Sequence, residues 1–331
     1  MQIVFTLCSI NYLAQAKTLG DSVLRHNPGY KFIIGLIDKN HTNVDLSFLG
    51  DLEFIEVDKI GIDGLEDMSA RYSIVELVTA TKPFYFDYLF KRYPDAVAVT
   101  YLDPDIKVFA PLTDMAEKLK TFNLILTPQI TQPIHDNLLP TEKHVYNTGV
   151  FNLGFAAMRR GAEAEKINAW WMERLRFECL QDLPRGYFVD QLWMNLAPAF
   201  FDKVLIEKHP GWNAAHWNLH ERTLSEVDGQ ILVNQQPLVF FHFSHFSPKH
   251  PEVIAAYHTR FSFETRPDLR ALFRQYSEDL LSNRYFDLIG VRCFYMNNER
   301  QKGLKRKAMG WLRQNLPQSV KMKLGKVLKR A

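Results

Sequence analysis

The sequence of 331 residues predicts an α/β protein with a mainly parallel sheet and flanking helices. Three observations carry this prediction. An apolar, β-prone run opens the chain, a segment with helical spacing follows it, and further short apolar runs alternate with helical stretches. Such alternation requires crossover connections, so we expect parallel strands joined by right-handed crossovers. The composition, 47% hydrophobic and 23% charged, is that of a globular protein.

The apolar runs predict the strands. Each is short, β-prone and bounded by polar or turn residues, and the expected ranges are 3–7, 31–37, 52–57, 96–102, 124–127, 204–206 and 237–241. Residues 146–153 are expected to form a turn followed by one more strand.

Helices are predicted where apolar residues recur with a period near 3.6. The expected ranges are 12–25, 68–93 with a second helix starting near Pro83, 157–179 and 188–200. Near residues 262–268 the sequence becomes helical and increasingly basic. We therefore expect a catalytic domain at 1–265 and a helical C-terminal region at 266–331.

The three cysteines, Cys8, Cys179 and Cys293, are far apart and form neither a disulfide framework nor a metal-ligand spacing. This usage favours a reducing compartment. The N-terminus lacks the pattern of a signal peptide, and no apolar run approaches the roughly 20 residues that span a bilayer. We expect a cytoplasmic protein, peripheral on the inner face of the membrane.

Positive charge is concentrated at the C-terminus. Residues 300–331 carry 11 Lys and Arg and no Asp or Glu, whereas residues 1–299 carry 29 basic and 37 acidic residues. Trp311 and aliphatic residues alternate with these charges at helical spacing, broken at Pro317, which suits an amphipathic helix on an anionic membrane. The alternatives for these residues are a disordered tail that increases solubility and a tail that binds another partner. Nucleic acid is the disfavoured partner.

Asp103 and Asp105 follow the strand expected at 96–102. Ligands of open α/β sheets bind at the carboxyl ends of strands, and two carboxylates one residue apart can face one hard cation. Mn²⁺ or Mg²⁺ held there would neutralise charge on a departing diphosphate. The competing interpretation is a surface turn, because Asp-Pro-Asp is common turn chemistry.

His242 also follows an apolar run, Pro237 to Phe241, and therefore lies at a strand end. A neutral imidazole could supply a third ligand to the same cation. A buried structural histidine is the alternative.

The segment Tyr101-Leu102-Asp103-Pro104-Asp105 resembles the Asp-x-Asp strand of the GT-A glycosyltransferases, and especially the retaining group that includes glycogenin and the lipopolysaccharide galactosyltransferases. The resemblance covers most of residues 1–250. Its other motifs are Thr6 to Leu13, Arg71 and Lys82, Tyr146 to Asn152, Asp190-Gln191 followed by Asn195, and His242-Phe243-Ser244. Their shared order is more specific than any single motif.

The resemblance implies a GT-A fold and a role for each motif. Residues implied to bind the nucleotide-sugar are Thr6, Ser9, Asn11, Tyr12, Arg71, Lys82, Asp103 and Lys249. Asn147, Asp190 and Gln191 are implied to lie beside the donor sugar and acceptor, and Asp103, Asp105 and His242 to hold the metal. Solvated helix charges are the alternative for Arg71 and Lys82, and a backbone carbonyl or a helix cap could satisfy the other three polar side chains.

The sequence departs from the family pattern after His242. The family has His-x-x-Gly followed by Lys-Pro, whereas this chain has His245 at the glycine position and Lys249 one place late. A second unusual segment, Trp212, Asn213, His216, Trp217 and Asn218, combines aromatic faces that stack on sugars with groups that bind hydroxyls. A packed loop over the core is the alternative.

The expected function is therefore the metal-dependent transfer of a sugar from a nucleoside diphosphate donor, with UDP favoured, to a hydroxyl of a glycan or lipid-linked acceptor, with retention. The basic tail would suit a lipid-linked acceptor. A catalytically inactive sugar-binding protein and a sugar nucleotidyltransferase are the alternatives, although residues 9–15 lack the Gly-rich loop that the latter needs.

Overall fold

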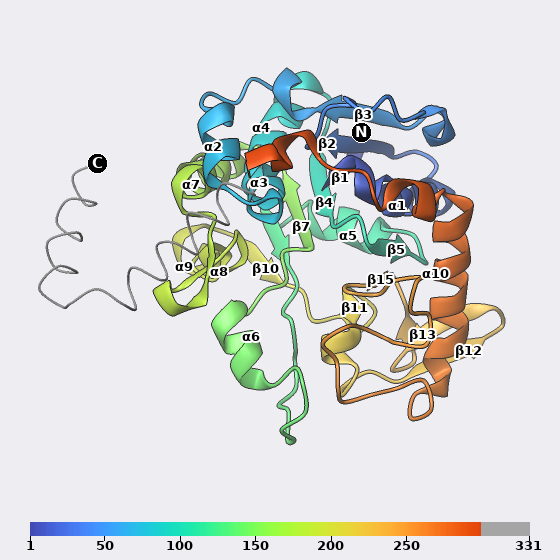
Figure 1. The fold of residues 1–331 in the computed structure, drawn as a ribbon. Coiled ribbons are helices and arrows are strands. Elements are labelled where there is room, and N and C mark those ends of the chain that lie inside the picture. Colours follow the sequence, from blue (N-terminus) through green and yellow to red (C-terminus); the bar gives the residue numbers. More distant parts are fainter. Residues whose placement is uncertain (299–331) are drawn as a thin grey trace, which may run out of the picture.

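Seven strands form the central sheet in the order β10-β6-β7-β4-β1-β2-β3 in the computed structural model, which describes residues 1–298 (Figure 1). Their bounds are β1 Gln2–Cys8, β2 Lys31–Leu36, β3 Glu53–Glu56, β4 Ala98–Leu102, β6 Leu124–Leu126, β7 Phe155–Arg159 and β10 Val204–Ile206. Within this sheet β7 runs antiparallel to β4 and β6, and the remaining pairs are parallel. The predicted α/β class with a mostly parallel sheet is confirmed.

Helices cover both faces of the sheet, so the first strand carries apolar residues on both of its faces. In β1, Ile3, Phe5 and Leu7 pack into one core, and Val4 and Cys8 into the other. The first core contains residues of α2 Leu65–Arg71, α3 Ile74–Ala80, α4 Lys82–Arg92 and α7 Ala162–Glu178. The second contains residues of α1 Leu13–His26, α5 Thr113–Lys118 and α10 Arg270–Ser282.

Three smaller sheets complete the described fold. One has the order β11-β15-β5, formed by Ala214–Ala215, Phe240–His242 and Ile106–Val108. Another is a meander of β12 Leu224–Val227, β13 Gln230–Val233 and β14 Gln236–Pro237, and the last is the pair β8 Gln181–Asp182 and β9 Tyr187–Phe188. Short helices are α6 Glu142–Thr148, α8 Gln191–Met194, α9 Ala197–Phe200 and α11 Tyr285–Leu288.

The prediction for residues 146–159 is wrong. Residues up to Thr148 belong to α6, whose first turn is capped by Thr141 and His144. The strand is β7, which pairs with β4 and β6 where the sequence predicts the start of a helix, and α7 begins only after Gly161. The helix expected at 188–200 is divided into α8 and α9.

Residues 266–298 share a core with the rest of the body. Tyr276 of α10 stacks on Phe243 with ring centroids 3.8 Å apart, and Phe273 packs against Phe241 and Phe243. In Figure 1, α10 stands beside the sheet that contains β15. The two predicted tail helices, within residues 299–331, lie outside the described residues.

The last described segment returns to the start of the chain. The Phe294 N–H donates to Asp38 Oδ1 (2.7 Å), and the other oxygen of Asp38 accepts from the Ile10 N–H (3.1 Å). The 3₁₀ helix η7, Phe294–Asn298, is thereby held near the end of β1. Within residues 1–298, no helix combines the length and apolar character needed to cross a membrane.

Candidate active site

Asp103 and Asp105 lie where β4 of the large sheet passes into β5 of a small one. The Asp103 N–H donates to the Gly154 carbonyl (2.8 Å), and the Ile106 N–H closes a turn onto the Asp103 carbonyl (3.1 Å). The backbone is therefore held on both sides of Pro104, and the two carboxylates have a fixed separation in space. The position at the carboxyl end of β4 is the one predicted.

His242 reaches Asp105 through strand register. β15 runs antiparallel to β5 with His242 opposite Ile106, and the Phe243 N–H donates to the Asp105 carbonyl (2.8 Å). The Nε2 atom of His242 lies 3.0 Å from Asp105 Oδ1 and 3.7 Å from Asp103 Oδ2. Two sequence positions more than 130 residues apart thus meet at one point.

The electrostatics of these three side chains favour a cation. Burial raises the pKa of Asp103 more than Lys82 and His242 lower it, so this carboxyl resists ionisation unless a further positive charge is bound beside it. Burial also opposes ionisation of Asp105, but His242, His245 and a backbone hydrogen bond together lower its pKa below the usual value. Burial lowers the pKa of His242, and the two carboxylates raise it above its usual value.

The donor set fits a divalent cation. One ligand atom from each of Asp103, Asp105 and His242 lies within 4.8 Å of the others. Two carboxylate oxygens and one imidazole nitrogen are ligands that Mn²⁺ accepts, and three protein ligands leave positions for phosphate oxygens. These three residues would hold the ion.

Gly154 makes room for this arrangement. A Cβ atom at this position would lie 2.5 Å from His242 Cε1 and 2.8 Å from Asp103 Oδ2. Real Cβ atoms do not approach other atoms so closely, so any side chain here would displace two of the three candidate ligands. No motif in the sequence singles out Gly154, although a glycine beside a strand often marks a close approach of other atoms.

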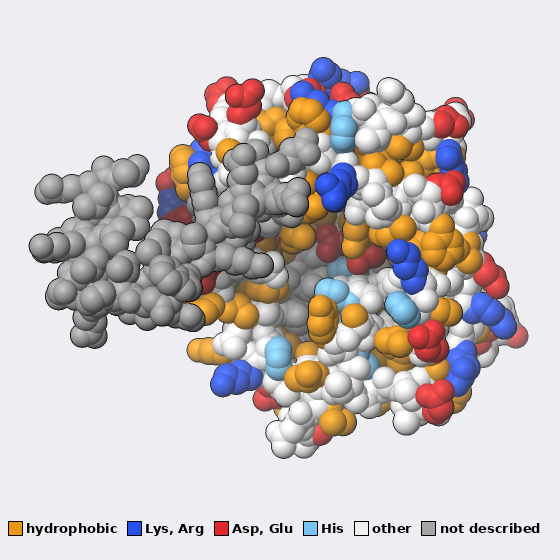
Figure 2. Space-filling view, in the orientation of Figure 1, with side chains coloured by type: hydrophobic (Ala, Val, Ile, Leu, Met, Phe, Trp, Pro, Cys, Tyr) orange, Lys and Arg blue, Asp and Glu red, His pale blue; other side chains and the backbone are white. Residues whose placement is uncertain are grey.

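Two cavities meet at the carboxylate pair, and both are lined by Asp103 and Asp105. The first, named the β1 cavity, has a volume of about 320 Å³ and is otherwise lined by residues such as Ser9, Asn11, Tyr12, Ile74, Val78 and Met296. The second, named the histidine cavity, measures about 550 Å³ and includes His144, His216, His242, His245, Trp217 and Tyr257. Figure 2 shows a hollow on this face with acidic and histidine side chains inside it.

Besides Asp103, three of the residues predicted to bind the nucleotide-sugar line the β1 cavity. They are Ser9, Asn11 and Tyr12, and the Ser9 hydroxyl donates to Asn11 Oδ1 (2.6 Å). Thr6 is buried within β1 and does not line this cavity. Met296 of η7 completes the wall, a contribution that no pattern in the sequence indicates.

Lys82 lies behind the carboxylate pair and lines neither cavity. Its Nζ donates to Asp190 Oδ2 (2.5 Å) and to the Leu153 carbonyl (2.8 Å), and lies 4.2 Å from the centroid of the Tyr101 ring. The Tyr101 hydroxyl in turn donates to Asp103 Oδ1 (2.5 Å). Lys82 therefore supports the site from behind.

Asp190 and Gln191 are held differently. Burial raises the pKa of Asp190, and the Lys82 ammonium opposes that rise. Gln191 lines the histidine cavity, donates to the Thr148 carbonyl (2.8 Å) and accepts from the Leu153 N–H (3.2 Å). Its amide is thus fixed in orientation at the cavity wall.

Three other predicted residues lie apart from the cavities. Asn147 is exposed on α6, and its neighbours Thr148 and Asn152 line the histidine cavity instead. Arg71 donates to the Arg176 carbonyl of α7 (2.6 Å), and Lys249 is exposed and lines neither cavity.

His245 occupies the glycine position of the family pattern with a backbone φ of +61°. This is the left-handed region, which glycine adopts without strain and other residues adopt rarely. The backbone at His245 therefore keeps the turn that a glycine would adopt. The imidazole that His245 adds at this position lines the histidine cavity.

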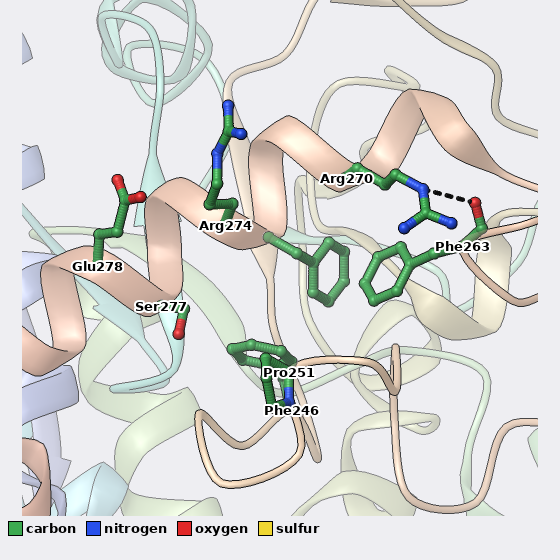
Figure 3. Close-up of a pocket in the computed structure, with 8 residues that line it drawn as sticks. Phe246, Pro251, Phe263, Arg270, Arg274, Ser277 and Glu278 are labelled. Carbon is green, nitrogen blue, oxygen red and sulfur yellow. Dashed lines mark hydrogen bonds between the residues drawn. The ribbon is translucent and has the colours of Figure 1, made fainter.

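A separate cavity lies along α10, away from the carboxylates (Figure 3). Phe246, Pro251, Phe263 and Phe273 gather there, and Arg270 donates to the Phe263 carbonyl (3.1 Å). In the close-up, Arg274 and Glu278 point away from these rings.

Fold and site together define an α/β protein with two cavities that meet at a carboxylate–histidine cluster. No protein-family model matches the chain. In sequence it is similar to two uncharacterized proteins of Bacillus subtilis (strain 168). YfnF is 25% identical over 256 residues, which are 75% of this chain and 81% of YfnF, and YfnD is 25% identical over 196 residues, which are 59% and 61%.

In structure the chain is similar to solved glycosyltransferases, the class that its motifs resemble. The galactosyltransferase LgtC, in complex with donor and acceptor sugar analogs, is 17% identical with a TM-score of 0.46, over 88% of this chain and 98% of LgtC. The glycosyltransferase GlyE of Streptococcus pneumoniae TIGR4 is 17% identical with a TM-score of 0.47, over 88% of this chain and 65% of GlyE.

Proposed function

We propose that this protein is a metal-dependent glycosyltransferase that moves a sugar from a nucleoside diphosphate donor to an acceptor hydroxyl. One observation carries the proposal: Asp103 and Asp105 line both cavities. A two-substrate transfer needs two binding spaces that meet where the bond is exchanged, and the carboxylate pair stands at that meeting point.

The β1 cavity suits the nucleoside. Apolar Ile74, Val78 and Met296 offer faces for a base, and Ser9 and Asn11 offer polar groups for its edge or for the ribose. The motif resemblance favours UDP. Mn²⁺ or Mg²⁺ bound by Asp103, Asp105 and His242 would neutralise the departing diphosphate.

We assign the donor sugar to the side of the histidine cavity that Gln191 lines, where this residue presents a fixed amide. Asp190 is buried behind that wall, paired with Lys82, and lines neither cavity. Retention of the anomeric configuration follows from the resemblance. A cytoplasmic location, peripheral on the inner face of the membrane through the basic tail, and a glycan or lipid-linked acceptor complete the proposal.

Incubation of the full chain with a panel of nucleotide-sugars and Mn²⁺ tests it. Slow release of nucleoside diphosphate is expected, and Asp105→Ala should abolish the release. Asp95→Ala is the matched control, because Asp95 is an exposed aspartate outside both cavities. If no donor is hydrolysed or bound, the proposal is wrong.

A second candidate is a sugar-nucleotide binding protein without turnover. It is favoured by the linings of the two cavities, which contain no Lys or Arg among residues 1–298. In that case leaving-group charge would rest on the metal alone. Donor binding in calorimetry without any release of nucleoside diphosphate would support this alternative.

A further inference from the structure

One wall of the histidine cavity consists of aromatic and imidazole side chains. His216 and Trp217 come from the 3₁₀ helix η5, His216–Asn218, and His245 and Tyr257 come from the loops after β15. The ring centroid of His245 lies 6.2 Å from that of His216 and 5.4 Å from that of Tyr257. Trp217 lies 5.2 Å from His242, so this wall extends to the candidate metal ligands.

Two buried polar atoms of this wall have no hydrogen-bond partner among residues 1–298. They are Nδ1 of His216 and Nε1 of Trp217, and the two side chains belong to residues that are only 8% and 7% exposed. Buried polar atoms in folded proteins are nearly always paired, because an unpaired one forfeits its hydrogen bonds to water. Both residues line the histidine cavity, so a bound ligand can supply the hydrogen-bond partners that the protein does not.

The charged residues of the histidine cavity limit the charge that such a ligand can carry. The described lining of the cavity contains Asp103 and Asp105 and no Lys or Arg, and the proposed cation is engaged by the donor diphosphate. Burial, reinforced by His258 and His245, lowers the pKa of His216 to about 3, which keeps this imidazole neutral near pH 7. A phosphate or carboxylate in this space would be desolvated beside like charges and without a cationic partner.

We propose that the histidine cavity takes the acceptor as a neutral, hydroxyl-bearing sugar ring, and that His216 and Trp217 are specificity-determining residues that bind its hydroxyl groups. A hydroxyl both donates and accepts, so it can satisfy an indole N–H and an imidazole nitrogen together. The exposed ring of Tyr257 adds an apolar face at the rim. This inference rests on the proposed function and adds the chemical class of its second substrate.

Binding is measured first, by saturation-transfer NMR on the full chain without donor. The probes are methyl glycosides of the neutral hexoses, the matching hexuronic acid glycosides and the hexose 6-phosphates. At least one neutral glycoside should bind, and at least tenfold more tightly than its two anionic counterparts. Equal or tighter binding of the anionic probes, or no binding of any probe at millimolar concentration, overturns the inference.

The role of the wall is tested with Trp217→Phe, which keeps a ring and removes only the indole N–H. Trp171→Phe is the matched control, since Trp171 Nε1 is also buried and unpaired but lies in the core beside α4 and outside both cavities. Loss of one hydrogen bond should weaken glycoside binding roughly tenfold in Trp217→Phe and leave it unchanged in the control. Equal effects in the two variants would assign a structural role to Trp217.

A second variant keeps the test valid if Trp217→Phe does not fold. His216→Leu removes the imidazole nitrogens, and it should weaken glycoside binding while Mn²⁺ binding at the carboxylates is unchanged. The inference fails if glycoside binding is also unchanged. These readouts need no donor, so glycoside binding without any donor hydrolysis would refute the proposed function alone, and donor hydrolysis with preference for anionic probes would refute only this inference.

Discussion

Lys82 and Asp190 form an ion pair with Nζ 2.5 Å from Oδ2, and their side chains are only 1% and 3% exposed. Two charges removed from water in this way are stable only together, because each alone would be desolvated without compensation. The pair joins α4 to the residue before α8, and Gln191 follows at once. It therefore fixes the backbone directly before Gln191, which lines the histidine cavity.

Lys82→Met should lower the free energy of unfolding by about 3–5 kcal/mol, because it leaves the Asp190 carboxyl buried without its partner. Adding Asp190→Asn should recover part of this loss. Urea denaturation measures both. The control is Lys91→Met, whose ion pair with Asp87 is exposed and should contribute no more than about 1 kcal/mol. Similar losses in Lys82→Met and Lys91→Met would contradict this interpretation.

Asp105→Asn should weaken Mn²⁺ binding by more than about a hundredfold, since the loss of a direct ligand exceeds the 10–100-fold typical of a supporting partner. Calorimetry with Mn²⁺ alone measures the change, and Asp95→Asn serves as the control. Binding of Mn²⁺ that is unaffected by Asp105→Asn would mean that the ion lies elsewhere.

Gly154→Ala should weaken Mn²⁺ binding by roughly 10–100-fold while keeping every ligand in the sequence. The added methyl group would lie 2.5 Å from His242 Cε1, so the ligand side chains must move apart. Gly29→Ala is the matched control, because nothing lies within 4 Å of a Cβ atom there. A Gly154→Ala protein with full Mn²⁺ affinity would show that the three side chains adapt freely.

The ion pair between Asp136 and Arg260 should make part of the free energy of unfolding depend on pH in the acidic range. The Arg260 guanidinium and the Leu138 N–H lower the pKa of Asp136 from 3.8 to about 2. A lowered pKa means that the contribution is complete above 3.8 and is lost as the pH falls toward 2.

The urea midpoint of Asp136→Asn should therefore lie below that of the unmodified chain at pH 5, and the difference should shrink as the pH falls from 3.8 toward 2. Asp51→Asn is the control, at an exposed aspartate without an ion pair among the described residues. A constant difference at every pH would assign the effect to packing and not to charge.

The strands of the large sheet could largely be predicted, because burial on both faces leaves continuous apolar runs such as Ile3 to Leu7. The failure at β7 has a physical cause. Its sequence, Phe155 to Arg159, lies close before the amphipathic stretch of α7, and only pairing with β4 and β6 selects the strand. Gly161 marks the division, but local sequence does not decide which side is helical.

The meeting of Asp103, Asp105 and His242 could be predicted because each lies at the end of an apolar strand. The role of Lys82 could not, since nothing in its helix shows that Asp190 is buried against it. Arg71 and Asn147 share this difficulty: a motif gives their order in the chain, whereas orientation depends on helix rotation within the packed fold. Met296 reaches the β1 cavity through the fold of the C-terminal segment, which no short-range pattern encodes.

The return of η7 to the β1 cavity has a practical consequence for protein production. A chain shortened to end at residue 265 would strip α10 from Phe241 and Phe243 and would remove Met296 from the cavity wall. Such a fragment would expose aromatic surface and, on the proposed function, would bind the donor nucleoside poorly, however stable its sheet. A cut for crystallisation or for tag placement is better made after residue 298, where the segment held by Asp38 is complete.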